Sequence, residues 1–239
     1  MKAVVIGGTG FVGMNVVKAL VQEGHDVTAT RRERANTLFA RKMGAKLVHA
    51  DLDNEDSLVE AMTGREVVFM CAGHYPRFSL DLDGEIAIAR KRASQAVRAA
   101  MRAKVQRFVL TSSVATIGPA PKDQALANEQ CPMTKSMRRS VYYAVKEAIE
   151  NETFKAQAQG LDTVTLCPTG IMGPLDVKAG TGFVIVAVGN GMLPFHIDGR
   201  TNVVDVEDLA LAHIAAAERG RTAERYIIGG HNTTIRELL

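Results

Sequence analysis

Two side chains near the middle of the sequence have the types and the spacing of an acid–base pair. Tyr142 and Lys146 are four residues apart in a segment with helical periodicity, which places them on one helix face with about 5–6 Å between their Cβ atoms. A free phenol has a pKa of about 10, but a neighbouring ammonium favours the phenolate and lowers that pKa. Tyr143 competes for this role, although the residue four positions after it, Glu147, would not activate a phenol. The spacing therefore predicts that Tyr142 is a general acid or base and that Lys146 tunes it.

Ser113 has a hydroxyl that would complete such a site. It follows a predicted strand over residues 107–111, and ligands in open α/β sheets bind at the carboxyl ends of the strands. We expect Ser113 to hold an oxygen of the substrate against Tyr142. We interpret the neighbouring Ser112 and Thr111 as structural residues or as contacts to a cofactor.

A glycine-rich stretch near the start of the chain predicts where a cofactor would bind. The apolar run at residues 4–6 predicts a buried strand, and Gly7, Gly10 and Gly13 follow it with the spacing G-x-x-G-x-x-G. Gly7 permits a tight turn, Gly10 lets a pyrophosphate approach the backbone, and Gly13 lets the next helix pack closely on the sheet. That helix, predicted over residues 11–23, would present unpaired N–H groups to the phosphates. These features predict a dinucleotide-binding βαβ unit.

The rest of the chain alternates strands and helices, which predicts an α/β fold with a Rossmann-type, doubly wound parallel sheet. We expect a dinucleotide-binding domain over residues 1–168 and a small, partial substrate lobe over residues 169–239, interleaved with the last Rossmann elements. Residues 233–239 predict one capped helical turn, which is unstable alone. Either this turn docks elsewhere or the natural chain continues and the lobe is truncated. The further predicted strands are residues 26–30, 46–50, 66–71, 107–111, 161–167 and 225–228, and the further predicted helices are residues 54–62, 85–104, 140–159, 181–189 and 206–219, with another ending near residue 43.

Composition limits the classes of function. The 239 residues are 46% hydrophobic and 23% charged, with a net charge of +3, which is typical of a globular enzyme and does not argue for a nucleic-acid partner. Three widely spaced cysteines predict neither a disulfide framework nor a zinc site. The chain enters its first strand at once, and its longest apolar run, residues 183–188, is too short to span a membrane. We therefore expect a cytoplasmic protein without a metal, a nucleic-acid partner or a membrane span.

Taken together, the motifs resemble an extended short-chain dehydrogenase/reductase, the superfamily of sugar-nucleotide epimerases and dihydroflavonol reductase-like enzymes. The resemblance covers nearly the whole chain and is nearest to the dihydroflavonol reductase-like branch, which includes hopanoid-associated sugar epimerase-like proteins. The matching segments are Gly7-Gly8-Thr9-Gly10-Phe11-Val12-Gly13, Asp51-Leu52, Ala72-Gly73, Thr111-Ser112-Ser113, Tyr142 with Lys146, Pro168-Thr169-Gly170-Ile171 with Gly173-Pro174, Val204-Asp205-Val206-Glu207-Asp208, and Arg225-Tyr226-Ile227-Ile228-Gly229-Gly230 with Asn232 and Thr234.

The resemblance implies a role for each position. Tyr142 would protonate a carbonyl oxygen during hydride transfer, Ser113 would hydrogen-bond to that oxygen, and Lys146 would bind the nicotinamide ribose and tune Tyr142. Asp51 and Leu52 would flank the adenine, and Pro168 and Ile171 the nicotinamide. From the resemblance and the motifs together we expect substrate contacts at Ser113, His74 and Tyr75. We expect cofactor contacts at Gly7, Thr9, Gly10, Phe11, Val12, Gly13, Arg31, Arg32, Asp51, Leu52, Ala72, Gly73, Thr111, Tyr142, Lys146, Pro168 and Ile171.

Departures from the family's pattern refine these expectations. NAD-selective members carry an acidic residue at the end of the second strand, whereas this chain has Arg31, with Arg32 and Arg34 beside it. A cation there attracts a 2′-phosphate, so we predict a preference for NADP(H), with NAD(H) as the alternative if the arginines form only a solvated basic turn. Residues 201–203, Thr-Asn-Val, replace a run that reaches the nucleotide in sugar-nucleotide enzymes. Residues 89–90, Ala-Arg, replace an Asn-Val pair that supports the catalytic centre.

The predicted helix over residues 85–104 is strongly basic, and residues 86–122 contain no acidic side chain. This face could bind an anionic surface such as lipid or nucleic acid. The alternative, which we favour, is a homodimer through the helices 85–104 and 140–159, as is usual in the family. The basic residues are Arg90, Lys91, Arg92, Arg98, Arg102, Lys104 and Arg107, and the acidic residues that could complement them are Glu147, Glu150 and Glu152.

These observations predict an NADP(H)-dependent oxidoreductase that transfers a hydride to a ketone or aldehyde of a small, partly apolar substrate. One alternative is a sugar or nucleotide-sugar epimerase or dehydratase that retains its NAD(P). A second is a non-catalytic, NmrA-like dinucleotide sensor, against which the intact Ser113, Tyr142 and Lys146 argue. The substrate would be enclosed by loops at residues 74–83, 118–139 and 175–200, with an apolar wall formed by Tyr75, Phe78, Met172 and Phe195.

Overall fold

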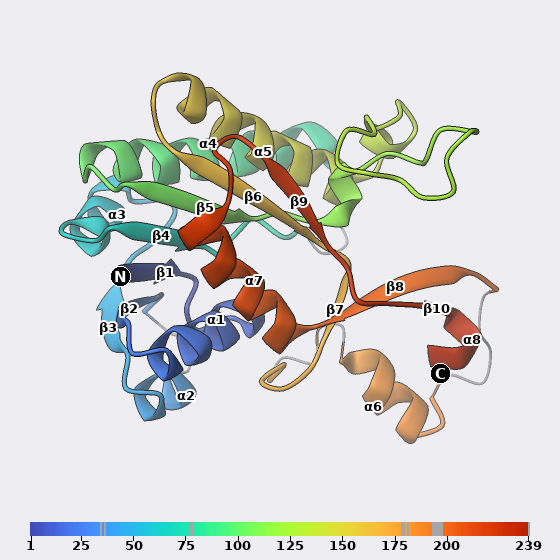
Figure 1. Cartoon of the computed structure of the whole chain (residues 1–239), viewed down its shortest axis with the longest axis horizontal. Helices are drawn as coiled ribbons and strands as arrows, with labels where there is room; N and C mark the ends of the chain where they lie inside the picture. Colours follow the sequence, from blue (N-terminus) through green and yellow to red (C-terminus); the bar gives the residue numbers. More distant parts are fainter. Residues whose placement is uncertain are drawn as a thin grey trace.

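The computed structural model describes residues 1–33, 35, 37–76, 79–177, 180, 182–192 and 198–238. Its centre is a seven-stranded sheet in the order β3-β2-β1-β4-β5-β6-β9 (Figure 1). Every pairing in this sheet is parallel, as the alternation of strands and helices predicts. The strand order reverses between β1 and β4, the place where ligands bind in doubly wound sheets. The strands are β1 (Lys2–Ile6), β2 (Asp26–Arg31), β3 (Lys46–His49), β4 (Val67–Met70), β5 (Arg107–Thr111), β6 (Thr163–Pro168) and β9 (Arg225–Ile228).

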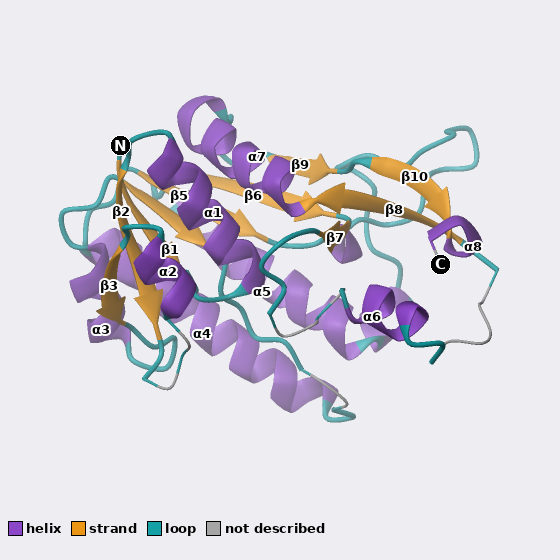
Figure 2. Ribbon diagram, turned by 90° about the horizontal axis from the view of Figure 1, so that it is seen from below, coloured by secondary structure: helices purple, strands orange, loops and turns teal. Residues whose placement is uncertain are grey.

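Helices cover both faces of this sheet (Figures 1 and 2). Parallel strands are buried on both sides, and β1 accordingly buries Val4 and Ile6 in one apolar core and Val5 in the other. The first core is closed by α3, α4 and α5, and the second by α1 and α7. The helices are α1 (Phe11–Gln22), α2 (Leu38–Lys42), α3 (Glu55–Met62), α4 (Leu82–Arg102), α5 (Val141–Ala158) and α7 (Val206–Arg219), with short 3₁₀ turns η1 (Val114–Thr116) and η2 (Met137–Arg139).

A second, three-stranded sheet extends from the carboxyl side of the main sheet (Figures 1 and 2). Its order is β10-β8-β7, with β7 parallel to β8 and β10 antiparallel to it. Within the part of the chain that the structure describes, no helix combines the length and the apolar character needed to cross a membrane. The elements of this region are β7 (Gly170–Met172), α6 (Phe183–Gly189), β8 (Arg200–Asp205), β10 (His231–Thr234) and α8 (Ile235–Leu238).

The structure confirms the predicted Rossmann-type α/β fold, and both α7 and β9, from beyond residue 168, belong to the main layers. α4 begins at Leu82 rather than at residue 85, because the Asp81 carboxylate caps it by accepting from the Gly84 N–H at 2.9 Å. The predicted terminal turn is α8, which Thr234 and Glu237 close with reciprocal hydrogen bonds. The sequence analysis missed β7, β8 and β10, which are short strands stabilised by distant partners. Thr181, in the predicted helix 181–189, lies outside the described residues.

Candidate active site

The glycine loop after β1 has the shape of a phosphate cradle. Gly7 adopts a φ of +85°, and its N–H donates to Thr30 Oγ1 at 3.0 Å. A Cβ atom added at Gly13 would lie 2.2 Å from the Gly7 carbonyl oxygen, so only glycine lets α1 approach the loop this closely. α1 begins at Phe11 without a side-chain cap from Gly10, which leaves its first N–H groups available to an anion. These features fit the pyrophosphate of a dinucleotide.

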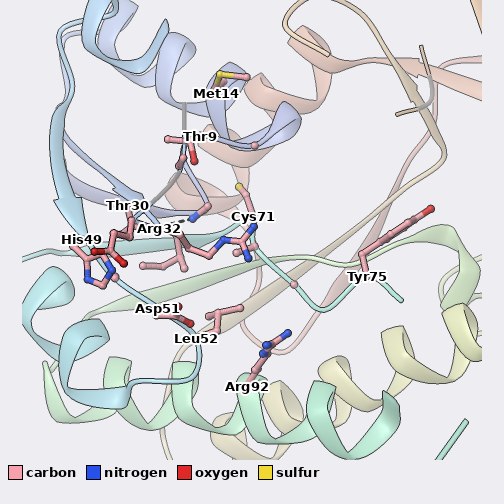
Figure 3. Close-up of a pocket in the computed structure, with 18 of the residues that line it drawn as sticks. Thr9, Met14, Thr30, Arg32, His49, Asp51, Leu52, Cys71, Tyr75 and Arg92 are labelled. Atoms are coloured by element: carbon pink, nitrogen blue, oxygen red, sulfur yellow. Dashed lines mark hydrogen bonds between the residues drawn. The ribbon is translucent and has the colours of Figure 1, made fainter. Parts of the chain in front are cut away.

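A cleft of about 1110 Å³ adjoins this loop (Figure 3). It lies at the carboxyl ends of β1, β2, β3 and β4, on both sides of the point where the strand order reverses. Predicted cofactor residues that line the cleft are Gly7, Thr9, Gly10, Arg32, Asp51, Leu52, Ala72 and Gly73, and lining residues that the sequence analysis did not single out for the cofactor include Met14, Thr30, His49, Asp53, Cys71, Arg92 and Val177.

Other predicted cofactor residues lie away from this lining. The Thr111 hydroxyl is 2.7 Å from Nε2 of the buried His213, Pro168 is buried at the end of β6, and Ile171 is half-buried in β7. Their roles toward a cofactor remain predictions. Among the described residues, those predicted to bind cofactor but not found in the cleft lining are Phe11, Val12, Gly13, Arg31, Thr111, Tyr142, Lys146, Pro168 and Ile171.

Arg31 and Arg32, at the end of β2, lie in different environments. Arg31 is the last residue of β2, and its guanidinium donates to the Glu33 carbonyl oxygen at 3.4 Å. Arg32 instead lines the cleft, as does His49 from the end of β3 (Figure 3). The cation that faces the cleft is therefore Arg32 rather than Arg31, the residue on which the sequence argument rested. Arg34 lies outside the described residues.

Near the carboxyl end of β5, Tyr142 lies beside Ser113, and Lys146 lies beside the preceding residue, Ser112. Ser113 is buried, and its Oγ accepts from the Ala115 N–H at 3.1 Å, which fixes the start of η1. A side-chain hydrogen bond with Ser113 acts on the pKa of the Tyr142 phenol. Lys146 Nζ donates to the Ser112 carbonyl oxygen at 3.5 Å. A hydroxyl, a phenol and an amine are thus gathered near Tyr75, which lines the cleft and contacts Tyr142.

Burial dominates the pKa of Tyr142. Desolvation raises this pKa because it disfavours the phenolate, the hydrogen bond with Ser113 opposes the rise, and Tyr75 and Tyr143 add to it. The prediction that the pKa is lowered is therefore wrong, since Lys146 is not among the groups that shift it. Burial also lowers the pKa of Lys146. At neutral pH Tyr142 is consequently a protonated phenol, the form that a proton donor requires.

Two of the predicted substrate contacts, His74 and Tyr75, lie in the loop after β4. The rings of Tyr75 and Tyr142 meet edge to face with centroids 5.2 Å apart, and Tyr75 also lines the cleft. His74 is held by the Glu85 carboxylate at Nε2 and by Arg92 at Nδ1, 3.0 Å away, so it supports this loop. In the predicted apolar wall, Met172 is half-buried in β7. Phe78 and Phe195 lie outside the described residues.

The basic side chains of α4 are paired largely within the chain. Arg98 and Arg102 bind Glu55 at 2.7 and 2.8 Å, and Arg102 also binds Asp56 at 3.0 Å. Arg90 lies 3.8 Å from Glu152. The other two acidic residues expected to complement this helix have different partners, because Glu147 pairs with Arg138 and Glu150 with Arg225. These contacts weaken the interpretation of α4 as an unpaired cationic surface.

The chain matches the model of the NAD dependent epimerase/dehydratase family over residues 3–229. It belongs to this family. Over 244 residues it is 32% identical to a putative dihydroflavonol 4-reductase of Synechocystis sp., an alignment that covers 98% of this chain and 69% of that protein. The structure is similar to a nucleoside-diphosphate-sugar epimerase from Pseudomonas aeruginosa, with a TM-score of 0.85 and 26% identity over 100% of this chain and 75% of the other. It is also similar to vestitone reductase from alfalfa, with a TM-score of 0.75 and 26% identity over 99% and 79% of the two chains.

Membership in the NAD dependent epimerase/dehydratase family confirms the predicted extended short-chain dehydrogenase/reductase superfamily and its dihydroflavonol reductase-like character. The chain is accordingly an NAD(P)-dependent oxidoreductase of this superfamily. The glycine loop and the cleft fit the dinucleotide that this class requires.

Proposed function

We propose that this protein is an NADP(H)-dependent reductase that converts a ketone or aldehyde of a small, partly apolar organic molecule into an alcohol. The observation that carries the proposal is the grouping of Ser113, Tyr142 and Lys146 near the carboxyl end of β5, where Tyr142 contacts Tyr75 of the cleft lining. The relatives named as a dihydroflavonol 4-reductase and a vestitone reductase support this class of substrate.

Each of the three side chains has a separate role in the proposed reaction. When bound, the nicotinamide dinucleotide supplies the hydride that adds to the carbonyl carbon. Tyr142 donates its phenolic proton to the carbonyl oxygen, and the Ser113 hydroxyl holds that oxygen in place. Proton transfer leaves a phenolate that the hydrogen bond with Ser113 stabilises, and Lys146, which donates to the Ser112 carbonyl oxygen, would bind the nicotinamide ribose. Hydride and proton together give the neutral alcohol, and the raised pKa of Tyr142 keeps the proton available at neutral pH.

The acid–base role is tested by replacing Tyr142 with phenylalanine and following NADPH oxidation with a panel of apolar ketones and aldehydes. Tyr142→Phe should lower kcat by about 100- to 10,000-fold, the range for loss of a general acid, while NADPH still binds. Tyr143→Phe is the matched control, since its ring lies beside Tyr142 at 6.0 Å between centroids, and it should retain activity. Equal activity of wild type and Tyr142→Phe would overturn the mechanism.

NADP(H) preference is supported by Arg32 and His49, which line the cleft at the ends of β2 and β3. A guanidinium there would bind the 2′-phosphate that distinguishes NADPH from NADH. Arg32→Ala should reduce the preference for NADPH by about tenfold or more, and Arg31→Ala should change it little because Arg31 lies outside the cleft lining. Titration of each variant with NADPH and with NADH measures the ratio of the two affinities. If Arg31→Ala has the larger effect, Arg31 binds the phosphate.

A second candidate is a sugar or nucleotide-sugar epimerase or dehydratase, favoured by the similarity to the Pseudomonas epimerase. Against it, Asn202 in β8 is occupied by structural contacts, because its Oδ1 accepts from Thr169 at 2.7 Å and from the Gly230 N–H at 3.0 Å. Nucleotide released from purified protein separates the candidates. Stoichiometric NAD that stays bound through purification would favour the epimerase. Reversible NADPH binding with turnover would favour the reductase, and reversible NADPH binding without turnover would favour a sensor.

We also infer that the protein forms a homodimer through α4 and α5 and that it acts in the cytoplasm. Ile88 is 39% exposed on α4, and the intrachain pairing of the basic residues on this helix reduces the charge that would oppose association. Sedimentation should give a dimer for wild type and a monomer for Ile88→Glu. A wild-type monomer would exclude the proposed assembly.

A further inference from the structure

A buried carboxylate lies close to the proposed catalytic residues. Glu150 follows Lys146 by one turn of α5, and only 3% of its surface is exposed. An ionised carboxylate is costly to bury unless charged and hydrogen-bonding partners compensate it. The hydrogen-bonding and charged partners of Glu150 therefore indicate what role the buried carboxylate has.

The Glu150 carboxylate accepts hydrogen bonds from Ser112 and Thr116. These two residues lie on either side of residues 113–115, which we call the Ser113 turn. Glu150 Oε1 accepts a short hydrogen bond from the Ser112 hydroxyl and another from the Thr116 hydroxyl at 2.7 Å. The Thr116 hydroxyl also lies 2.8 Å from the Ser113 carbonyl oxygen. The Cys167 thiol approaches Oε1 at 3.7 Å. Glu150 thereby holds the backbone that carries the Ser113 hydroxyl.

The compensating charge comes from a distant part of the chain. Arg225 begins β9, the edge strand beside β6 (Figure 1), and its Nε lies 3.3 Å from Glu150 Oε2. The same guanidinium donates to the Thr116 carbonyl oxygen at 3.0 Å and to the Glu129 carbonyl oxygen at 3.3 Å. Arg225 thus joins α5, the Ser113 turn and the loop that precedes α5.

Ser112 connects this pair to Lys146. Its hydroxyl donates to Glu150, and its carbonyl oxygen accepts from Lys146 Nζ. Three titratable groups act on the pKa of Lys146, namely Glu150 on α5, Cys167 on β6 and Cys71 after β4, and Glu150 acts most strongly. Its negative charge raises the pKa of Lys146 and so opposes the effect of burial.

We propose that Glu150, held by Arg225, is a positioning residue that fixes the Ser113 turn and, through Ser112, the backbone carbonyl oxygen to which Lys146 donates. The proposal rests on the proposed reductase function and adds a residue to the same site. Folding alone does not require such a pair, because apolar residues of similar volume often replace a buried ion pair without loss of stability. The location of the pair, in contact with both sides of the Ser113 turn, gives it a role in the chemistry.

The kinetic test compares Glu150→Gln with Glu152→Gln. Glu152 is a matched control because it is also buried on α5 and ion-paired, with Lys155 at 2.6 Å, but lies away from the Ser113 turn. Glu150→Gln should lower kcat roughly 10- to 100-fold with little change in NADPH affinity, as expected for misplaced reacting groups. The alkaline limb of its pH profile should move to lower pH, because Lys146 loses its proton more readily. Glu152→Gln should resemble wild type.

A second measurement does not depend on turnover. NMR titration of protein carrying ¹³C-labelled lysine, with the Lys146 signal assigned from Lys146→Met, reports the protonation of Lys146 directly. Its midpoint should fall in Glu150→Gln, because the negative charge that opposes the effect of burial is gone, and stay at the wild-type value in Glu152→Gln. If wild type reduces no carbonyl, the proposed function fails, and this titration still decides the role of Glu150.

The double variant Glu150→Met with Arg225→Met removes both charges and separates positioning from folding. It should still unfold in a single cooperative transition, although at a lower temperature because Ser112, Thr116 and the Glu129 carbonyl oxygen lose hydrogen-bond partners, and it should have the low kcat of Glu150→Gln. Wild-type kcat in the double variant, or wild-type kcat and Lys146 titration in Glu150→Gln, would overturn the proposal.

Discussion

Tyr75 and Tyr142 meet edge to face, with ring centroids 5.2 Å apart. Tyr75 comes from the loop after β4 and also lines the dinucleotide cleft, whereas Tyr142 is the proposed acid on α5. One aromatic contact therefore joins the cleft to the proton donor. Burial is the main cause of the raised pKa of Tyr142, and the electrostatic effect of Tyr75 raises that pKa further.

Replacing Tyr75 with alanine should weaken the reductase and change its pH dependence. Loss of an edge-to-face contact of about 1 kcal/mol corresponds to roughly a fivefold fall in kcat/KM. Opening Tyr142 to water should lower the pKa of its phenol, so activity that needs the protonated form should be lost at a lower pH than in wild type. Tyr75→Phe keeps the ring and serves as the control. A pH–rate profile of Tyr75→Ala identical to that of wild type would contradict the role given to this contact.

Arg92 should matter for dinucleotide binding more than any other basic residue of α4. Its guanidinium donates to both carboxylate oxygens of Asp53, with the shortest distance, 2.6 Å, from Nη2 to Oδ2. Its Nη1 lies 3.0 Å from His74 Nδ1. Arg92 and Asp53 line the cleft, so Arg92→Ala releases two loops of the site and should weaken NADPH binding about tenfold. Arg98→Ala is the control, because Arg98 makes an exposed pair with Glu55 that contributes little to stability. Fluorescence titration of NADPH measures both, and equal affinities in the two variants would exclude this role.

The contrast between Arg92 and the proposed catalytic residues explains which parts of the site the sequence could predict. Tyr142 and Lys146 are related by a local spacing on one helix, and Ser113 by its place after a strand, so sequence alone brings them together. Arg92 faces the cleft only because α4 packs on the sheet with one particular rotation, which no local pattern specifies. Thr30, at the end of β2, could have been found with the strand-end rule that located Ser113.

Two misjudged features have the same origin in long-range packing. The predicted direction of the Tyr142 pKa shift was wrong because the fold buries the phenol, and Tyr75, from a distant loop, raises the pKa further. The strands β7 and β8 were missed because each is stabilised by pairing with the other, across residues 173–199, and a three-residue strand carries almost no periodicity of its own.

Gly13→Ala should disrupt the phosphate cradle. The added methyl group would lie 2.2 Å from the Gly7 carbonyl oxygen and 2.8 Å from its carbon, and neither backbone atom can move without displacing the loop. We expect NADPH binding to fall at least about tenfold and the free energy of unfolding to drop by roughly 1–3 kcal/mol. Gly189→Ala is the control, since a Cβ atom there meets nothing within 4 Å and alanine favours a helix. NADPH titration and thermal unfolding measure both effects, and wild-type binding by Gly13→Ala would show that the loop can relax.

His213 should make the fold sensitive to acid. It is fully buried between the Thr111 hydroxyl and the Leu209 carbonyl oxygen, each 2.7 Å away, and burial lowers its pKa from 6.5 to about 4. Between these values the unfolded chain binds a proton that the folded chain does not. The full contribution of His213 to the free energy of unfolding is therefore present above pH 6.5, and it falls by up to about 3 kcal/mol as the pH drops to about 4. Urea unfolding across this range should show a shallower decline in His213→Gln than in wild type, even if the variant is less stable at neutral pH. Equal slopes would mean that other groups set the acid sensitivity.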